Sequence, residues 1–109
     1  MSFITVGAPH NVTLTATAPA RHLCPYVNEK DEGTVTVTWL TQGRTFELHS
    51  LRRHLDQFMV EWGGEEISHE EFTLKLKDTF APVHAGAGLQ VLSVRTDWTT
   101  AGMPVVCST

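Results

Sequence analysis

Two stretches of the chain alternate strictly between apolar residues and threonine. Residues 12–18 and residues 34–39 share this design, and their apolar positions are Val12, Leu14, Ala16 and Ala18 in the first and Val35, Val37 and Trp39 in the second. A period of two places alternate side chains on opposite faces of a strand, and β-branched threonine suits the solvated face. The pattern therefore predicts two half-buried strands. We expect Pro19 to end the first, and a turn at residues 41–44 with extended chain over residues 45–48 to follow the second.

Apolar residues then recur with helical spacing. Leu51 begins a stripe that continues at i+4, i+7, i+8 and i+11, through Leu55, Phe58, Met59 and Trp62. This spacing is typical of an amphipathic helix, and Gly63-Gly64 is a stop signal.

A second helix has a complete start signal. Ser68 and Glu71 match the capping box, and Ile67 and Phe72 occupy the hydrophobic staple positions around it. The apolar stripe continues through Leu76 and Phe80, and Ala81-Pro82 is expected to end the helix.

The last third of the chain returns to extended patterns. Residues 85–88 are a small-residue loop, residues 89–98 a third strand, residues 101–102 a turn and residues 103–107 a fourth strand. The order β-β-α-α-β-β predicts an α+β fold, with a four-stranded antiparallel sheet backed on one face by two antiparallel helices. So small a sheet leaves edges that other subunits could cover.

Composition limits the function classes. The 109 residues predict a single domain, 1–109, and the net charge of −4 argues against a protein that grips nucleic acid mainly by its charge. No apolar run approaches the roughly 20 residues of a membrane span. Residues 1–9 lack the basic start and apolar run of a signal peptide. We therefore expect a cytoplasmic protein that is not bound to a membrane.

Only two cysteines occur, which excludes a disulfide-stapled scaffold and a four-cysteine zinc site. Cys107 follows two valines in the fourth strand and is interpreted as an apolar packing residue. Cys24 instead lies in a polar segment before Pro25, with Arg21, His22 and Lys30 near enough in sequence to favour its thiolate. It is either a nucleophile or a spare loop cysteine.

Three further residues could act with Cys24. Asp31 follows it by seven positions and is either a solvated loop carboxylate or, if the loop turns back, a proton donor or base beside the thiol. His69 and Glu70 follow the cap of the second helix. The helix dipole alone explains a glutamate there, but a carboxylate can also accept both hydrogen bonds of a guanine-like edge.

A polar cluster opens the first helix and consists of Glu47, His49, Ser50, Arg52, Arg53 and His54. Ser50 is the expected N-cap. The rest is either a solvated face or a contact for phosphate or nucleotide. His22 and Cys24, with another histidine, could bind zinc, but no set of ligands has a recognised zinc-site spacing.

Taken together, three segments resemble the QueF family, the 7-cyano-7-deazaguanine (preQ0) nitrile reductases and their shorter QueF-like relatives. The segments are Leu23-Cys24-Pro25 with Asp31 and residues 33–36, then Ser68-His69-Glu70-Glu71, and then Glu47-Leu48-His49-Ser50-Leu51-Arg52. The resemblance implies a tunnelling fold (T-fold) and a homo-oligomeric ring of the pentamer or decamer type, with active sites at subunit boundaries. It also implies that Cys24 attacks a nitrile and Asp31 transfers protons. His69 would lie at the nitrile and Glu70 would hold the deazaguanine edge.

The chain departs from the reductases at their cofactor motif, Glu-x-Lys-Ser-Leu-Lys. Glu47 and Ser50 are kept, but His49 and Arg52 replace the lysines. A reductase of this family uses NADPH. The shorter QueF-like amidinotransferases, of the archaeosine synthase type, lack the motif, need no cofactor and use ammonia. The altered motif and the short chain favour ammonia and an amidine product.

Two other classes stay open at this point. One is a metal-dependent enzyme on the same fold, similar to pterin or GTP cyclohydrolases, and the other is a non-catalytic purine-binding ring subunit. The substrate could be the free base or a base within tRNA or DNA, and the acidic charge favours the free base.

Overall fold

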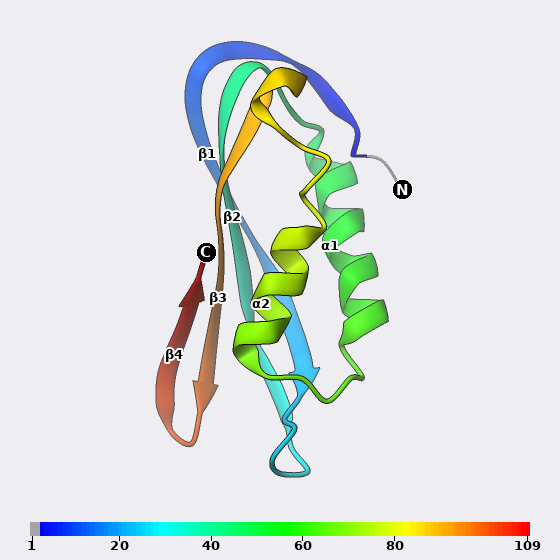
Figure 1. Cartoon of the computed structure of the whole chain (residues 1–109), viewed down its shortest axis with the longest axis vertical. Coiled ribbons are helices and arrows are strands. Elements are labelled where there is room, and N and C mark those ends of the chain that lie inside the picture. Colours follow the sequence, from blue (N-terminus) through cyan, green and yellow to red (C-terminus); the bar gives the residue numbers. More distant parts are fainter. Residues whose placement is uncertain (1–2) are drawn as a thin grey trace.

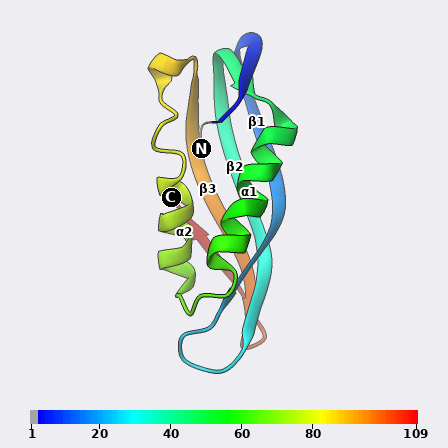
Figure 2. The ribbon, with the colours of Figure 1, turned by 90° about the vertical axis from the view of Figure 1, so that its right-hand side faces the viewer.

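The computed structural model describes residues 3–109, which form one antiparallel sheet covered by two helices. In chain order the elements are β1 (Thr5–Leu23), β2 (Lys30–Phe46), α1 (Leu48–Trp62), α2 (His69–Asp78), the short 3-10 helix η1 (Ala85–Ala87), β3 (Leu89–Thr100) and β4 (Met103–Ser108). The strands lie in the order β1-β2-β3-β4, each antiparallel to the next. Both helices lie on one face of the sheet (Figures 1 and 2). The expected order and layers are confirmed.

The first two strands are longer than expected. Pro19 does not end β1 but pairs with Thr34, because a strand at the edge of a sheet tolerates a residue without an N–H group. The expected turn at residues 41–44 is also wrong. These residues continue β2, and the pairing with β1 shifts register between Gly7 and Thr13. Gly43 has a φ of 104°, so its turn-like sequence marks an irregularity within a strand.

The two faces of the sheet differ as their sequence pattern predicts. Val35, Val37 and Trp39 are fully buried beneath the helices, against apolar residues of α1 and α2. On the other face threonines of β1 and β2 pair across the strands, with hydroxyl oxygens 3.2 Å apart for Thr15 and Thr38. The helices therefore cover the apolar face and leave the threonine face uncovered in the described part of the chain.

The two helices begin with different caps. Ser68 accepts a hydrogen bond from the Glu71 amide (3.1 Å) at the start of α2, as expected. At α1 the expectation of a Ser50 cap is wrong. The Glu47 carboxylate caps this helix by accepting from the amides of His49 (3.0 Å) and Ser50 (2.7 Å). Ser50 lies one turn too far along the chain to cap the helix, and its buried hydroxyl instead accepts from the Ile4 amide.

A tight hairpin joins β3 to β4. Ala101 and Gly102 have φ values of 53° and 75°, and the flanking Thr100 and Met103 pair across the turn. Two successive positive φ angles are typical of a type I′ turn, which fits the twist of antiparallel strands. The turn fixes Thr100 at one end of the sheet. Among residues 3–109, neither helix is long and apolar enough to cross a membrane.

Candidate active site

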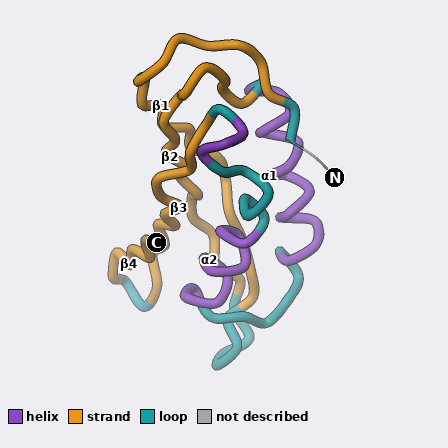
Figure 3. Tube along the Cα trace, turned by 45° about the horizontal axis from the view of Figure 1, so that its top comes forward, coloured by secondary structure: helices purple, strands orange, loops and turns teal. Residues whose placement is uncertain are grey.

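Three segments far apart in the sequence meet at one end of the sheet. They are the loop between β1 and β2, the start of α2, and the turn between β3 and β4, all at the lower end of Figure 1. Figure 3 shows these loops in teal at the same end. The segment before α2 is tied directly to β1, because Leu23 donates its amide to the Glu65 carbonyl and accepts from the Ile67 amide. This tie brings the start of α2 beside the end of β1.

A chain of hydrogen bonds runs through this end. His22 is 1% exposed, and its Nε2 lies 2.7 Å from Nδ1 of His69. The His22 Nδ1 lies 2.9 Å from the Leu23 carbonyl oxygen, and the His69 Nε2 lies 2.8 Å from the Thr100 hydroxyl. The two histidines therefore have a partner on every ring nitrogen.

Asp31 completes the cluster from β2. It is directly opposite His22 in the β1–β2 register, and one carboxylate oxygen lies 4.0 Å from the His22 Nδ1. Asp31 is only 4% exposed. Burying a carboxylate costs free energy unless charges or hydrogen bonds compensate it. Its position beside two histidines therefore marks Asp31 as a candidate functional residue.

Trp98 holds both imidazoles in place. Its ring stacks on His69 with centroids 4.7 Å apart and planes 13° apart, and it meets the His22 ring edge-on at 4.6 Å. Gly33 leaves room for this ring, because a Cβ atom there would collide with the Asp97 carbonyl and lie 2.9 Å from the indole. The strand pairing therefore places an aromatic wall behind the cluster.

A second, buried chain of hydroxyls anchors α2 to β3. The Thr73 hydroxyl donates to the His69 carbonyl (2.8 Å), so its 2.6 Å contact with Thr96 has Thr96 as donor. Thr96 in turn accepts from the Trp98 indole N–H at 2.8 Å. Every hydroxyl proton of this chain is used, which fixes the first turn of α2 and with it His69.

The pKa of His69 is lowered from its usual value of 6.5. Burial is the largest cause and the neighbouring His22 adds to it, while Asp31 and Glu70 act in the opposite direction. His69 is therefore neutral near pH 7, the form that can accept a proton.

Cys24 lies one residue beyond β1, at this same end. Its amide donates to the Glu29 carbonyl at 2.9 Å, which closes the loop, and its thiol is free and half-buried. Its position two residues after His22 and opposite Glu29 places it beside the strand ends that carry His22 and Asp31. The neighbouring residues Pro25–Asn28 are exposed.

Glu70 lies in the first turn of α2, next to His69, and is exposed. Its place satisfies the helix dipole and also leaves the carboxylate open to a ligand. A groove of about 370 Å³ adjoins the site, between the end of α1 and the β1–β2 hairpin, with His22, Leu23 and Gly63 among its lining residues. Its volume lies in the range of small-molecule pockets.

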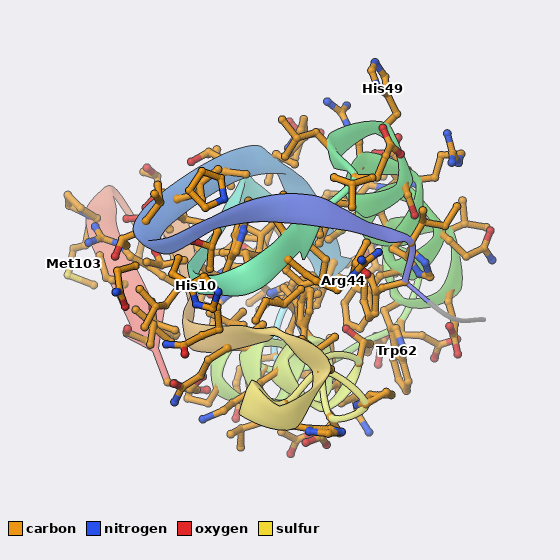
Figure 4. All side chains as sticks on the ribbon, turned by 90° about the horizontal axis from the view of Figure 1, so that it is seen from above. His10, Arg44, His49, Trp62 and Met103 are labelled. Carbon is orange, nitrogen blue, oxygen red and sulfur yellow. The ribbon has the colours of Figure 1, made fainter. Side chains whose placement is uncertain are left out.

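The residues of the expected cofactor motif lie elsewhere. They are at the start of α1, toward the opposite end of the molecule (Figure 1). The Glu47 carboxylate is engaged in capping and lies 2.9 Å from the His49 Nδ1, and these hydrogen bonds lower the pKa of Glu47. The His49 side chain is 90% exposed and points outward (Figure 4). Arg52 pairs with Asp56 at 2.8 Å, and Ser50 is buried.

This second cluster does not fit NADPH well. The Glu47 carboxylate already caps α1, and Ser50 is buried. Of the two positions where the reductases have lysine, only Arg52 carries a permanent positive charge, and it is paired with Asp56. Within one subunit the cluster is also separated from Cys24 by the 15 residues of α1, about 22 Å of helix.

A metal ion would find donors at the first site. Ligand atoms of His22, Asp31 and His69 all lie within 4.8 Å of one another, and Cys24 is not a member of this group in the described chain. From its sequence, His22 is a candidate zinc ligand only in combination with Cys24. The alternation that puts Ala16 and Ala18 on the buried face continues through Ala20 to His22. A strand that ends at Pro19, as expected from the sequence, does not include these two positions.

No protein-family model and no curated protein sequence matches the chain. Among solved structures, it is similar to the crystal structure of the archaeosine synthase QueF-Like in the apo form. The two share a TM-score of 0.66 and 18% identity, over 94% of this chain and 93% of that one. The similarity therefore extends over almost all of both chains, and at this identity it establishes the fold. The expected tunnelling fold is confirmed: this chain has the fold of QueF-Like.

Proposed function

We propose that this protein modifies a 7-deazaguanine by attacking the nitrile of 7-cyano-7-deazaguanine with Cys24 and passing the product to ammonia. The thiolate sulfur adds to the nitrile carbon, and the nitrile nitrogen takes up a proton to give a covalent thioimide. Ammonia then adds to the same carbon and expels the thiolate, which leaves an amidine. A covalent intermediate divides one difficult addition into two easier steps.

The other site residues have separate roles in this scheme. Asp31 transfers the proton that the nitrogen requires, and neutral His69 orients the nitrile or exchanges that proton. Glu70 accepts the two adjacent N–H donors of the deazaguanine edge, which its exposed position on the first turn of α2 allows. Cys24, Asp31, His69 and Glu70 belong to segments that meet at one end of the fold.

The observation that carries the proposal is this convergence within a fold shared with an archaeosine synthase. Asp31 and His69 are 38 residues apart in the sequence, yet both lie beside one buried histidine, His22. The unsuitability of the second cluster for NADPH favours ammonia over hydride as the second reactant. The alternative is an NADPH-dependent nitrile reductase that gives the aminomethyl product.

Intact-protein mass spectrometry tests the first step. Incubation with the free base should add the full mass of the nitrile, since addition expels no leaving group, and Cys24→Ala should abolish the addition. Tight binding that survives Cys24→Ser with no adduct in the wild type would instead support a non-catalytic purine-binding subunit.

Product analysis tests the second step. Ammonium salts should give an amidine, whereas NADPH should give no turnover. An aminomethyl product with NADPH would overturn the choice of ammonia. A parallel assay with tRNA or DNA carrying the nitrile base distinguishes a nucleic-acid substrate from the free base, which the acidic charge favours.

A metal-dependent enzyme of the same fold is the second candidate. The observation that favours it is the grouping of His22, Asp31 and His69 within 4.8 Å. Metal analysis of the purified protein discriminates the two, because one bound zinc per chain would favour the metal enzyme and would occupy the groups that the thioimide scheme needs.

We also propose that the subunits form a homo-oligomeric ring. The sheet has free edges at β1 and β4, and apolar residues such as Met103 and Val106 are exposed on the short edge strand. Native mass spectrometry should find a pentamer or decamer, and a monomer would contradict the proposal.

A further inference from the structure

His22 stands out as a buried polar residue that neither the sequence motifs nor the proposed reaction employs. It is 1% exposed, at the end of β1 on the face beneath the helices. Its ring is enclosed by Trp98 at 4.6 Å and Phe72 at 5.2 Å between centroids. A histidine surrounded by aromatic rings is costly to bury unless its nitrogens are paired, and both are.

The hydrogen bonds of His22 dictate which nitrogen carries the proton. A backbone carbonyl can only accept, so Nδ1 of His22 must donate to Leu23. In the neutral ring Nε2 is then an acceptor, and it faces Nδ1 of His69 at 2.7 Å. His69 therefore carries its proton on Nδ1.

This assignment determines what His69 offers at its other nitrogen. With Nδ1 protonated, the neutral ring has its lone pair on Nε2, where the Thr100 hydroxyl donates at 2.8 Å. The chain of donors thus runs from Thr100 through His69 and His22 to the Leu23 carbonyl. Nε2 is the basic nitrogen of His69, and Nδ1 is held by His22. A base oriented by a third group in this way is a common arrangement in catalysis.

His22 also lies beside both groups to which the proposed reaction assigns proton transfer. Asp31 is its direct cross-strand neighbour, 4.0 Å from Nδ1, and His69 is hydrogen-bonded to Nε2. The strand register and the tie between Leu23 and the segment before α2 fix both distances. Among the described residues, His22, Asp31 and His69 form a group whose ligand atoms all lie within 4.8 Å of one another.

We propose that His22 is a positioning residue that fixes the tautomer and orientation of His69, so that the lone pair, and with it the capacity to take up a proton, lies on Nε2 of His69. This inference rests on the proposed function for its kinetic consequence, but the tautomer itself does not depend on any activity.

Two substitutions of similar polarity separate positioning from packing. His22→Gln places an amide near the position of Nε2 and can still accept from His69. His22→Asn reaches only the position of Nδ1, so it can bond to Leu23 but leaves the His69 Nδ1–H without an acceptor. His22→Phe, which keeps a ring against Trp98 and Phe72 and removes both bonds, is a second variant in case the asparagine protein does not fold.

Nitrogen-detected NMR of the full chain reads the tautomer directly. The wild type and His22→Gln should show His69 protonated on Nδ1, and His22→Asn or His22→Phe should lose this preference. A wild-type His69 protonated on Nε2, or the same Nδ1 tautomer in all variants, would overturn the inference.

The kinetic arm measures adduct formation with 7-cyano-7-deazaguanine. His22→Asn should slow the maximal rate about 10- to 100-fold, less than the 10²–10⁴-fold contribution of an acid–base group itself, with little change in the concentration needed for half-maximal rate. His22→Gln should recover most of the rate. Equal rates in the asparagine variant and the wild type, or equal losses in both polar variants, would contradict positioning. Absence of any adduct in the wild type would overturn the proposed function instead, and the NMR result would still decide the role of His22.

Discussion

The two ends of the molecule carry similar side chains in opposite environments. At one end His22 and Asp31 are 1% and 4% exposed, and His22 and His69 have partners for every ring nitrogen. At the other end the His49 side chain is 90% exposed beside a glutamate. Both ends carry residues of a sequence motif, yet only the first has buried ionisable side chains among the residues compared.

The two ends differ in whether a structural role alone explains their polar side chains. Helix capping accounts for Glu47 completely, because its carboxylate satisfies two amides that the helix leaves unpaired. No comparable structural need accounts for two histidines and a carboxylate under an aromatic wall. Burial of ionisable groups around a specific partner is the feature that marks functional sites, so the comparison favours the buried end as the place of the chemistry.

The largest effect is expected from the residues that flank His22. Asp31→Asn and His69→Phe should each slow adduct formation at Cys24 by about 10²–10⁴-fold, because each removes a proton-transfer group. Stopped-flow absorbance or timed mass spectrometry measures the rate. The matched control is Arg52→Ala at the other end, which should react as the wild type does. If Arg52→Ala lost as much rate as Asp31→Asn, the contrast between the two ends would fail.

A loss of stability should follow from crowding the aromatic wall. Gly33→Ala would place a methyl group against the Asp97 carbonyl and the Trp98 ring, so we expect a loss of about 1–3 kcal/mol in the free energy of unfolding. Urea denaturation measures it. Gly64→Ala is the control, since a Cβ atom there meets nothing within 4 Å. Equal free energies of unfolding for the two variants would show that the packing of Trp98 does not require a glycine at position 33.

A smaller, pH-dependent effect is expected at His69. Because its pKa is lowered in the folded protein, the unfolded chain binds a proton first as the pH falls below about 6.5. The free energy of unfolding should therefore decrease as the pH falls below about 6.5, and the decrease should level off below the lowered pKa of His69. The free energy of unfolding of the wild type and of His69→Gln, compared from about pH 8 to about pH 5, isolates this slope. A wild-type midpoint above 6.5 in an NMR titration of His69 would contradict the assignment.

The smallest effect is expected at the exposed end. Glu47→Gln should lower the melting temperature slightly and leave adduct formation unchanged. The pKa of Glu47 is lowered from 4.5 by its hydrogen bonds to His49 and Ser50, so its contribution is present above about pH 4.5 and disappears as the pH falls through the lowered pKa. Thermal unfolding at several pH values checks this. A stability difference that grew on acidification would rule out the capping role.

Local patterns predicted most of the fold. Ser68 with Glu71 and Ile67 with Phe72 located the start of α2, because caps depend only on nearby residues. The strand breaks expected at Pro19 and Gly43 do not occur, since whether proline or glycine interrupts a strand depends on its place in the sheet. Likewise Ser50 has the right chemistry for a cap, but the chain bends one turn earlier, at Glu47.

The site was predictable only in part. Residue type and position make Asp31 and His69 candidates, the resemblance to a family motif supports them, and the structure brings them together. His22 and Thr100 were not predicted to join them, because their role depends on the β1–β2 register and on a turn at the end of β3. Contacts between distant segments leave no periodic signal in a single sequence.

The most direct test of the account is to locate the covalent adduct. The chain has two free, half-buried cysteines, Cys24 in the loop directly after β1 and Cys107 on β4. After incubation with 7-cyano-7-deazaguanine, trapping and proteolysis, peptide mapping should find the added mass on the peptide that contains Cys24 and none on the peptide that contains Cys107. An adduct on Cys107, equal labelling of both, or no adduct at all would contradict the account.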